Sequence, residues 1–233
     1  MQRDRSVPDP CVYCGFLGSG TRDHVPPRCL FPKPRPLDTV TVPACKSCNK
    51  SYQKDDEYFA VAMAAQGYGE DPEAARVWET IIRPMLARSP RLRRMISQNI
   101  LDAPVETPAG IVLPGRRAIR FSASRINRVV QRIVRGLLWH HYQQRPPADV
   151  EIVIFRGEKV PSQVADMINA FTKIAWIGDT IFRYRHAVAN GAPDTSIWAL
   201  QFYAYTQFIG IVQGESFVKA ELESSSAGTT EVK

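Results

Sequence analysis

The chain lacks any apolar run long enough to span a bilayer, and its first ten residues, MQRDRSVPDP, contain no apolar core of the kind found in signal peptides. These absences argue against a membrane-inserted or secreted protein and predict a cytoplasmic one. In that reducing compartment, paired cysteines are expected to bind metal rather than to form disulfides.

Lysine and acidic residues are scarce in the middle of the chain. Residues 74–145 contain 14 arginines, no lysine and three acidic residues, whereas residues 1–59 carry 9 basic and 7 acidic residues. The formal net charge of the whole chain is +7. Because a guanidinium group matches the geometry of phosphate oxygens, this arginine usage predicts a nucleic-acid-binding surface. A solvated charged face is the simpler alternative.

Four of the five cysteines form two Cys-x-x-Cys pairs, Cys11/Cys14 and Cys45/Cys48, which are separated by 30 residues. This spacing is typical of a tetrahedral zinc site. Iron–sulfur ligands usually cluster more tightly, and four buried free thiols are the other alternative. Four thiolates leave no open coordination position, so the predicted Zn²⁺ is structural and not catalytic. The fifth, Cys29, is expected to be a buried thiol.

Three polar residues accompany the cysteine pairs. Asp23-His24 is followed by Val-Pro-Pro, and Asn49 directly follows the last cysteine. Together with the two cysteine pairs, this pattern resembles the HNH endonucleases of the zinc-knuckle, ββα-metal type, over about residues 8–60. The resemblance implies that His24 is a general base activating water. It implies that Asp23 and Asn49 hold a catalytic Mg²⁺ or similar ion, and that the substrate is nucleic acid, with DNA favoured.

The residue types also suit phosphodiester hydrolysis on physical grounds. Histidine titrates near neutral pH and can act as a base without a large pKa shift. A cation is needed to neutralise phosphate charge, and a carboxylate with an amide oxygen suits Mg²⁺. Adjacent residues of a strand point to opposite faces. Asp23 and His24 would therefore converge only at a bend, for which Pro26-Pro27 is suited.

The pattern departs from the family in two places. The asparagine that usually precedes the second cysteine pair would fall near Val40, where none is present, and Tyr52 occupies the place of the usual lysine after Asn49. Thr39, Thr41 or a backbone carbonyl are candidates to orient the histidine instead. These departures leave an alternative open: a non-catalytic, zinc-stabilised nucleic-acid-binding protein with a degenerate HNH site.

Two groups of basic residues are candidate substrate contacts. Arg22, Arg28 and Lys50 lie close to the site in sequence. The second group lies on the clearest helix of the chain, residues 124–143, whose apolar positions form one stripe. Four arginines fall at i, i+3, i+7 and i+10 on the opposite face, which predicts a row facing phosphates: Arg125, Arg128, Arg132 and Arg135.

The remaining patterns predict an α+β fold. A small ββα-metal module with the four-cysteine site is expected at 1–60, an arginine-rich α+β domain with a mainly antiparallel sheet at 61–222, and a disordered tail at 223–233. The expected helices are one that starts after Ala44 and stops at Gly67, and others at 73–88 (with a kink or two helices because of Pro84), 90–101, 124–143 and 161–174. The expected strands are 38–42, 150–155, 180–189, 196–205 and 207–213, with a hairpin within 103–121.

Overall fold

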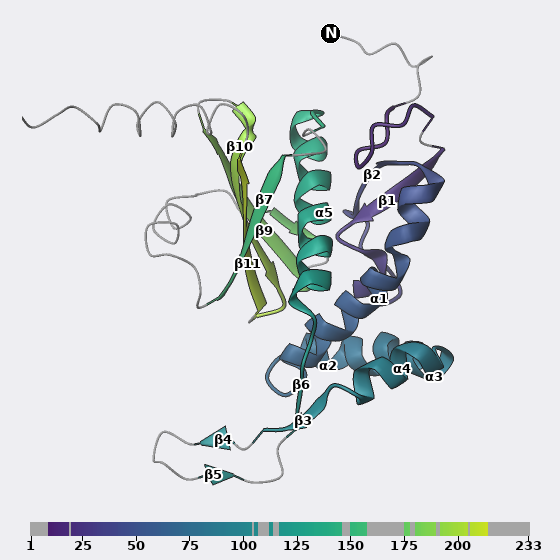
Figure 1. Cartoon of the computed structure of the whole chain (residues 1–233), viewed down its shortest axis with the longest axis vertical. Coiled ribbons are helices and arrows are strands. Elements are labelled where there is room, and N and C mark those ends of the chain that lie inside the picture. Colours follow the sequence, from purple (N-terminus) through teal and green to yellow (C-terminus); the bar gives the residue numbers. More distant parts are fainter. Residues whose placement is uncertain are drawn as a thin grey trace, which may run out of the picture.

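The computed structural model has the α+β architecture expected from the sequence, arranged in three layers (Figure 1). A five-stranded antiparallel sheet forms one layer, helix α5 (Ala123–Tyr142) the middle, and the N-terminal ββα unit the third. Within the described residues, no helix is both long and apolar enough to cross a membrane. The structure describes residues 9–18, 20–103, 105–106, 112–113, 117–145, 150–157, 175–177, 180–189, 192–204 and 206–213.

The N-terminal unit has the expected order of strand, strand and helix. Strand β1 (Thr21–Val25) pairs antiparallel with β2 (Val40–Ala44), and helix α1 (Lys46–Gly67) follows β2 almost directly. A short 3₁₀ turn, η1 (Arg28–Leu30), follows the first strand. Helix α1 ends at the glycine predicted to stop it. The unit therefore brings the cysteine pairs, Asp23-His24 and the start of α1 into one small volume.

A bent helical segment follows α1. The side chain of Asp71 caps its first helix, accepting hydrogen bonds from the N–H groups of Glu73 (2.8 Å) and Ala74 (3.0 Å). The segment comprises α2 (Pro72–Val77), a π-helical turn η2 (Trp78–Ile82), α3 (Arg83–Arg88) and α4 (Pro90–Ser97). Because Pro84 has no N–H, α-helical bonding cannot continue through it. The sequence predicted a kink or two helices at Pro84, and the irregularity in the structure is this π turn shortly before it, in which the N–H of Arg83 bonds to the carbonyl of Trp78.

The expected hairpin region forms two short antiparallel pairs, and the C-terminal sheet has the order β7-β11-β10-β9-β8 with every neighbour antiparallel. Strand β8 was not predicted. The expected helix at 161–174 and the tail at 223–233 lie outside the described residues. The strands are β3 (Ile100–Asp102), β4 (Val105–Glu106), β5 (Val112–Leu113), β6 (Arg117–Ile119), β7 (Glu151–Arg156), β8 (Ala175–Ile177), β9 (Phe182–Ala189), β10 (Ala192–Phe202) and β11 (Thr206–Gln213).

Helix α5 is packed on two sides, and glycines permit the close approach on each. A Cβ on Gly136 would lie 2.5 Å from Val25 Cγ2 of β1, and a Cβ on Gly210 of β11 would lie 2.9 Å from Val134 Cγ2 of α5. Buried side chains from Cys11 to Val212 accordingly form one continuous apolar cluster. The boundary expected at residue 60 falls inside α1, which is helical on both sides of it.

Gly136→Ala should lower the free energy of unfolding by about 1–3 kcal/mol because the added methyl overlaps Val25. This cost should appear despite the gain in helix propensity, which is about 1 kcal/mol for alanine over glycine. Denaturant unfolding of the two single variants and the double variant with Val25→Ala forms the test cycle. We expect Gly136→Ala to be nearly neutral, or stabilising, in the Val25→Ala background. An equal cost in both backgrounds would show that this contact is not the cause.

Candidate metal centre and polar cleft

The four paired cysteines converge at one point between the N-terminal loop and the start of α1. Their sulfur atoms all lie within 4.8 Å of one another, with Cys14 Sγ and Cys45 Sγ 3.8 Å apart. A tetrahedral centre with metal–sulfur bonds of about 2.3 Å has sulfur–sulfur edges of about 3.8 Å. The cluster therefore has the dimensions of a tetrahedral metal site and could hold a metal ion, as the spacing predicted.

Local backbone structure shapes this centre. The first pair lies on a tight turn in which the N–H of Gly15 bonds to the carbonyl of Cys11 at 2.8 Å, and Gly15 has φ +78°. Cys45 is the N-cap residue of α1, and its sulfur accepts a hydrogen bond from the N–H of Cys48 at 3.4 Å. This hydrogen bond lowers the pKa of the Cys45 thiol to about 7. At neutral pH a larger fraction of this thiol is therefore in the thiolate form that metals require.

Cys29 lies outside the cluster. Its thiol donates a hydrogen bond to the carbonyl of Asp56 at 3.4 Å, and burial raises its pKa well above the ordinary value. It therefore remains a protonated thiol at neutral pH and serves no metal in this arrangement.

Asp23 and His24 occupy successive positions of a regular strand, so their side chains leave β1 on opposite faces. Asp23 is 6% exposed, and its Oδ2 accepts a hydrogen bond from the hydroxyl of Tyr13 at 2.7 Å. The same oxygen lies 3.6 Å from Nε of Arg132, while Oδ1 accepts the N–H of His24 at 2.9 Å. The expected bend lies after the strand and does not turn the two side chains together.

His24 is half-buried and faces Thr41 across the strand pair. Burial, together with the positive charge of Arg28, lowers the pKa of its imidazole below 6.5. The ring is therefore neutral at pH 7, the form that accepts a proton. Thr41, one of the candidates to orient the imidazole, is engaged elsewhere, since its hydroxyl and carbonyl both accept hydrogen bonds from Arg22. No described residue hydrogen-bonds to the His24 ring.

Asn49 lies in the first turn of α1, directly after the last cysteine. Its amide nitrogen donates to Thr21 Oγ1 (3.3 Å) and to the carbonyl of Arg22 (3.2 Å), which ties α1 to β1. Because the NH₂ group is used in this way, the orientation of the amide is fixed. Its oxygen is the atom that remains for an external partner.

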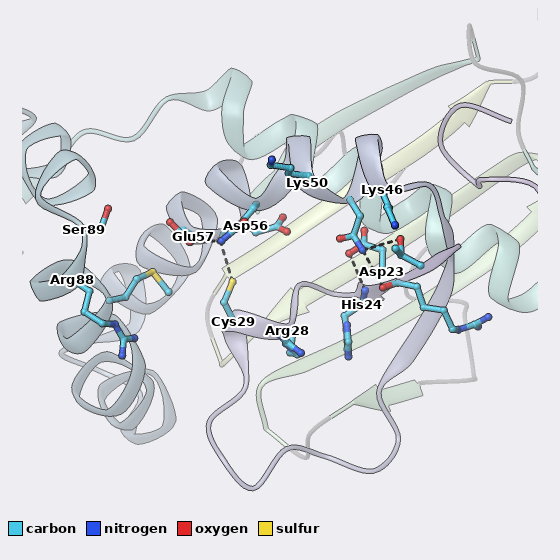
Figure 2. Close-up of a pocket in the computed structure, with 15 residues that line it drawn as sticks. Asp23, His24, Arg28, Cys29, Lys46, Lys50, Asp56, Glu57, Arg88 and Ser89 are labelled. Atoms are coloured by element: carbon cyan, nitrogen blue, oxygen red, sulfur yellow. Dashed lines mark hydrogen bonds between the residues drawn. The ribbon is translucent and has the colours of Figure 1, made fainter. Parts of the chain in front are cut away.

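Asp23, His24 and Asn49 all line one open cleft with a volume of about 740 Å³. Figure 2 shows α1 along one side of the cleft, the strand and loop that carry His24 and Arg28 along another, and Arg88 of α3 with Ser89 across from them. Basic side chains dominate the rim, and acidic side chains lie deeper. The cations that line the cleft are Arg22, Arg28, Lys46, Lys50 and Arg88.

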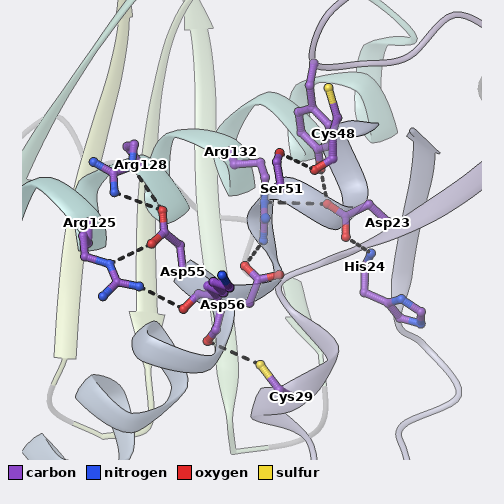
Figure 3. Close-up of polar contacts among 12 residues, drawn as sticks. Asp23, His24, Cys29, Cys48, Ser51, Asp55, Asp56, Arg125, Arg128 and Arg132 are labelled. Atoms are coloured by element: carbon purple, nitrogen blue, oxygen red, sulfur yellow. Dashed lines mark hydrogen bonds and ion pairs between the residues drawn. The ribbon is translucent and has the colours of Figure 1, made fainter. Parts of the chain in front are cut away.

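A buried ion network lies behind the cleft (Figure 3). Arg132 of α5 is 4% exposed and is ion-paired with Asp56 of α1 and Asp23 of β1. Its guanidinium also lies 4.5 Å from the centre of the Tyr52 ring. Burial raises the pKa of the Asp56 carboxyl to about 7, although Arg132 opposes the shift. Two acidic groups thus share one arginine in a site with little exposure to solvent.

The arginine row of α5 does not form a free basic face. Arg125 and Arg128 both pair with Asp55 of α1, at 2.7 Å and 3.1 Å, and the guanidinium of Arg125 also covers the ring of Tyr58 at 4.0 Å. The third member, Arg132, is buried, and Arg135 donates to the carbonyl of Val150 at 3.0 Å. The 3.6-residue period correctly placed these residues on one face, but that face packs against α1 and β7, although the Arg128 side chain remains 56% exposed.

The other three expected contacts, Arg22, Arg28 and Lys50, are exposed and line the cleft. Sequence reasoning missed the residues that α3 and its C-terminal end contribute to the cleft, which are Met85, Arg88 and Ser89. It also did not predict that Asp55 and Asp56 pair with the arginines of α5. Their spacing from the α5 arginines, about 70 residues, contains no local pattern that would have revealed the pairing.

Comparisons with known proteins leave the family open. No family model matches the chain, and the searches of curated proteins and of solved structures likewise found no match.

Proposed function

We propose that the chain is a metal-dependent nuclease of the HNH type that hydrolyses a phosphodiester bond of nucleic acid, with DNA as the first substrate to test. The observation that carries the proposal is that a neutral histidine, a carboxylate and an oriented amide line one cleft with a basic rim. A polyanionic strand fits such a rim electrostatically. The three polar groups have the chemistry that phosphodiester hydrolysis needs.

His24 is the proposed general base. Its lowered pKa keeps the imidazole able to take a proton from water at pH 7. Arg28, whose charge contributes to that shift, also lines the cleft and can hold the phosphate beside the base. In this role the half-buried position of His24 matters, because the ring is reachable from the cleft yet partly shielded from bulk water.

The donor atoms of Asn49 and Asp23 fit a hard divalent ion such as Mg²⁺. The amide NH₂ of Asn49 is already donated to β1, so its oxygen is the available atom, and Oδ1 of Asp23 accepts one backbone N–H and retains further lone pairs. With Asp56 ionised, two carboxylates face one arginine, leaving a net negative charge for a cation. When bound, such an ion neutralises phosphate charge and stabilises the leaving oxygen.

At the cysteine cluster we propose Zn²⁺ in a structural role. Four thiolates in a tetrahedron satisfy the coordination of zinc completely and leave no position for water or substrate. This ion would join the N-terminal loop to the start of α1 and so hold Asn49, the next residue in the chain, against β1.

The test is cleavage of supercoiled plasmid in the presence of Mg²⁺. We expect wild-type protein to nick the plasmid and His24→Ala to be slower by about 10²–10⁴-fold, the usual contribution of a general base. His140→Ala is the matched control, because His140 is an exposed histidine that does not line the cleft. Melting temperature and bound metal should be unchanged in both variants. Equal nicking by His24→Ala and wild type would refute the assignment.

A second candidate function is nucleic-acid binding without cleavage. It is favoured by Asp23, whose Oδ2 is already engaged by Tyr13 and Arg132, and by the buried Val40 at the place of the family's asparagine. Under this alternative the protein retains DNA whether or not a divalent ion is added, and no nicking is detected with Mg²⁺, Mn²⁺ or Ni²⁺. The plasmid assay therefore separates the two functions directly.

A further inference from the structure

Helices α3 and α4 contain a concentrated cluster of arginines that is separate from the arginine row of α5. From Thr80 to Leu101 the chain contains five arginines and no acidic residue. Arg83 is paired with Glu79 of the preceding turn at 2.8 Å. The other four, which we call the α3–α4 arginine surface, are all exposed: Arg88, Arg91, Arg93 and Arg94.

Ion pairing separates this surface from the arginines of α5. Arg125, Arg128 and Arg132 each have a carboxylate partner on α1. In contrast, no described acidic residue forms an ion pair with a member of the α3–α4 arginine surface. Their charges are therefore not neutralised within the described part of the chain, and they can act on an external anion.

The surface adjoins the proposed catalytic cleft. Met85 and Arg88 at the end of α3, and Ser89 between the helices, line the cleft together with His24 and Arg28. Figure 2 shows Arg88 and Ser89 on the opposite side from Arg28 and His24. Basic groups consequently stand on both walls, so a chain of phosphates held between them would pass over the polar residues of β1 and α1.

The α3–α4 arginine surface is held firmly by the core. Leu92 and Ile96 of α4 are each 6% exposed and belong to the main apolar cluster. The N–H of Ser89 bonds to the carbonyl of Met85, and the N–H of Arg93 bonds to the carbonyl of Ser89, each at 3.0 Å, which joins the two helices closely. The backbone that carries the four arginines is therefore ordered before any partner binds, which reduces the entropic cost of binding.

We propose that the α3–α4 arginine surface is the second wall of a nucleic-acid groove and binds the sugar–phosphate backbone beside the cleft. Guanidinium groups form paired hydrogen bonds with phosphate oxygens, and nucleic acid presents phosphates at regular intervals along a strand. The recessed shape of the cleft suits a strand better than the flat surface of an anionic membrane. The inference rests on the proposed function for the place of cutting, but the binding itself can be measured separately.

The experiment uses the full chain carrying His24→Ala, so that cleavage does not interfere, and measures its affinity for a short fluorescein-labelled DNA duplex at several salt concentrations without added Mg²⁺. In this background, Arg88→Gln/Arg91→Gln should bind more weakly. The slope of log affinity against log salt should fall in magnitude by about two, since each phosphate contact contributes about 0.9.

The matched control is Arg76→Gln/Arg128→Gln. It also removes two positive charges, but from arginines that are already paired with Glu73 and Asp55. Its salt slope should stay close to that of the parent. Circular dichroism melting should confirm that both double variants are folded. An unchanged slope for Arg88→Gln/Arg91→Gln, or binding to phosphatidylserine vesicles in preference to DNA, would overturn the inference.

The outcomes also separate this inference from the proposed function. If wild-type protein nicks plasmid while Arg88→Gln/Arg91→Gln keeps the parent salt slope, the nuclease stands and the groove wall is wrong. If no cleavage is detected while the slope falls as expected, the groove wall stands and the catalytic assignment fails.

Discussion

Arg132→Met should lower the free energy of unfolding by about 3–5 kcal/mol, the usual cost of removing one partner from a buried ion pair. The cost arises because Arg132 is 4% exposed and its guanidinium forms ion pairs with both Asp23 and Asp56. Without it, two carboxylates remain close together in a poorly solvated site. Denaturant unfolding at pH 7, monitored by circular dichroism, measures the difference.

Arg128→Met is the control for this prediction. Arg128 lies on the same helix, but its side chain is 56% exposed and its partner Asp55 keeps a second arginine, Arg125. The control should cost less than about 1 kcal/mol, as exposed pairs do. If Arg132→Met were instead as stable as wild type and bound DNA more weakly, Arg132 would be a substrate contact and the buried network would not be its role.

Removal of the metal ion proposed at the four cysteines should have the other large effect. Structural zinc contributes about 10–16 kcal/mol of apparent binding free energy in small zinc modules, and here its site supports β1, β2 and α1. The N–H of Val12, within the first cysteine turn, bonds to the carbonyl of Pro43 in β2, and Val25 of β1 packs against α5. We therefore expect that chelation, or Cys48→Ser, leaves the protein without a cooperative thermal unfolding transition.

The measurement combines elemental analysis with thermal unfolding before and after chelation. Wild-type protein should contain one zinc per chain, and Cys48→Ser should lose it together with the folding transition. Cys29→Ala is the matched cysteine control, because Cys29 bonds to the carbonyl of Asp56 and lies outside the metal cluster. Its metal content should be unchanged. A metal-free wild type with an unaltered transition in chelator would contradict the structural role.

The four-cysteine cluster and the ββα order could be predicted from sequence because their determinants are local. Two residues separate the cysteines of each pair, residues 38–42 alternate in the manner of a strand that the structure places at Val40–Ala44, and Gly67 ends α1. Each feature depends on chemistry within a few residues, which a sequence displays directly.

The environment of α5 could not be predicted in the same way. Helical periodicity reveals which residues share a face, but it does not reveal what that face contacts. The arginines of α5 were therefore taken as a solvent-facing row, although Asp55 and Asp56 meet them from a helix about 70 residues earlier. The cleft wall formed by the end of α3 and Ser89 was missed for the same reason, since its position across from His24 depends on tertiary packing.

The placement of α5 between the sheet and the ββα unit limits which segments of this protein can be exchanged in a chimera. A chimera cut at residue 60 would divide α1 within its helical span, Lys46–Gly67, and would separate Val25 from the Gly136 surface that covers it. The donor fragment would also lose Arg132, leaving Asp23 and Asp56 without their shared cation. The N-terminal ββα unit therefore cannot be transferred to another protein by itself, and a chimera would have to include α5.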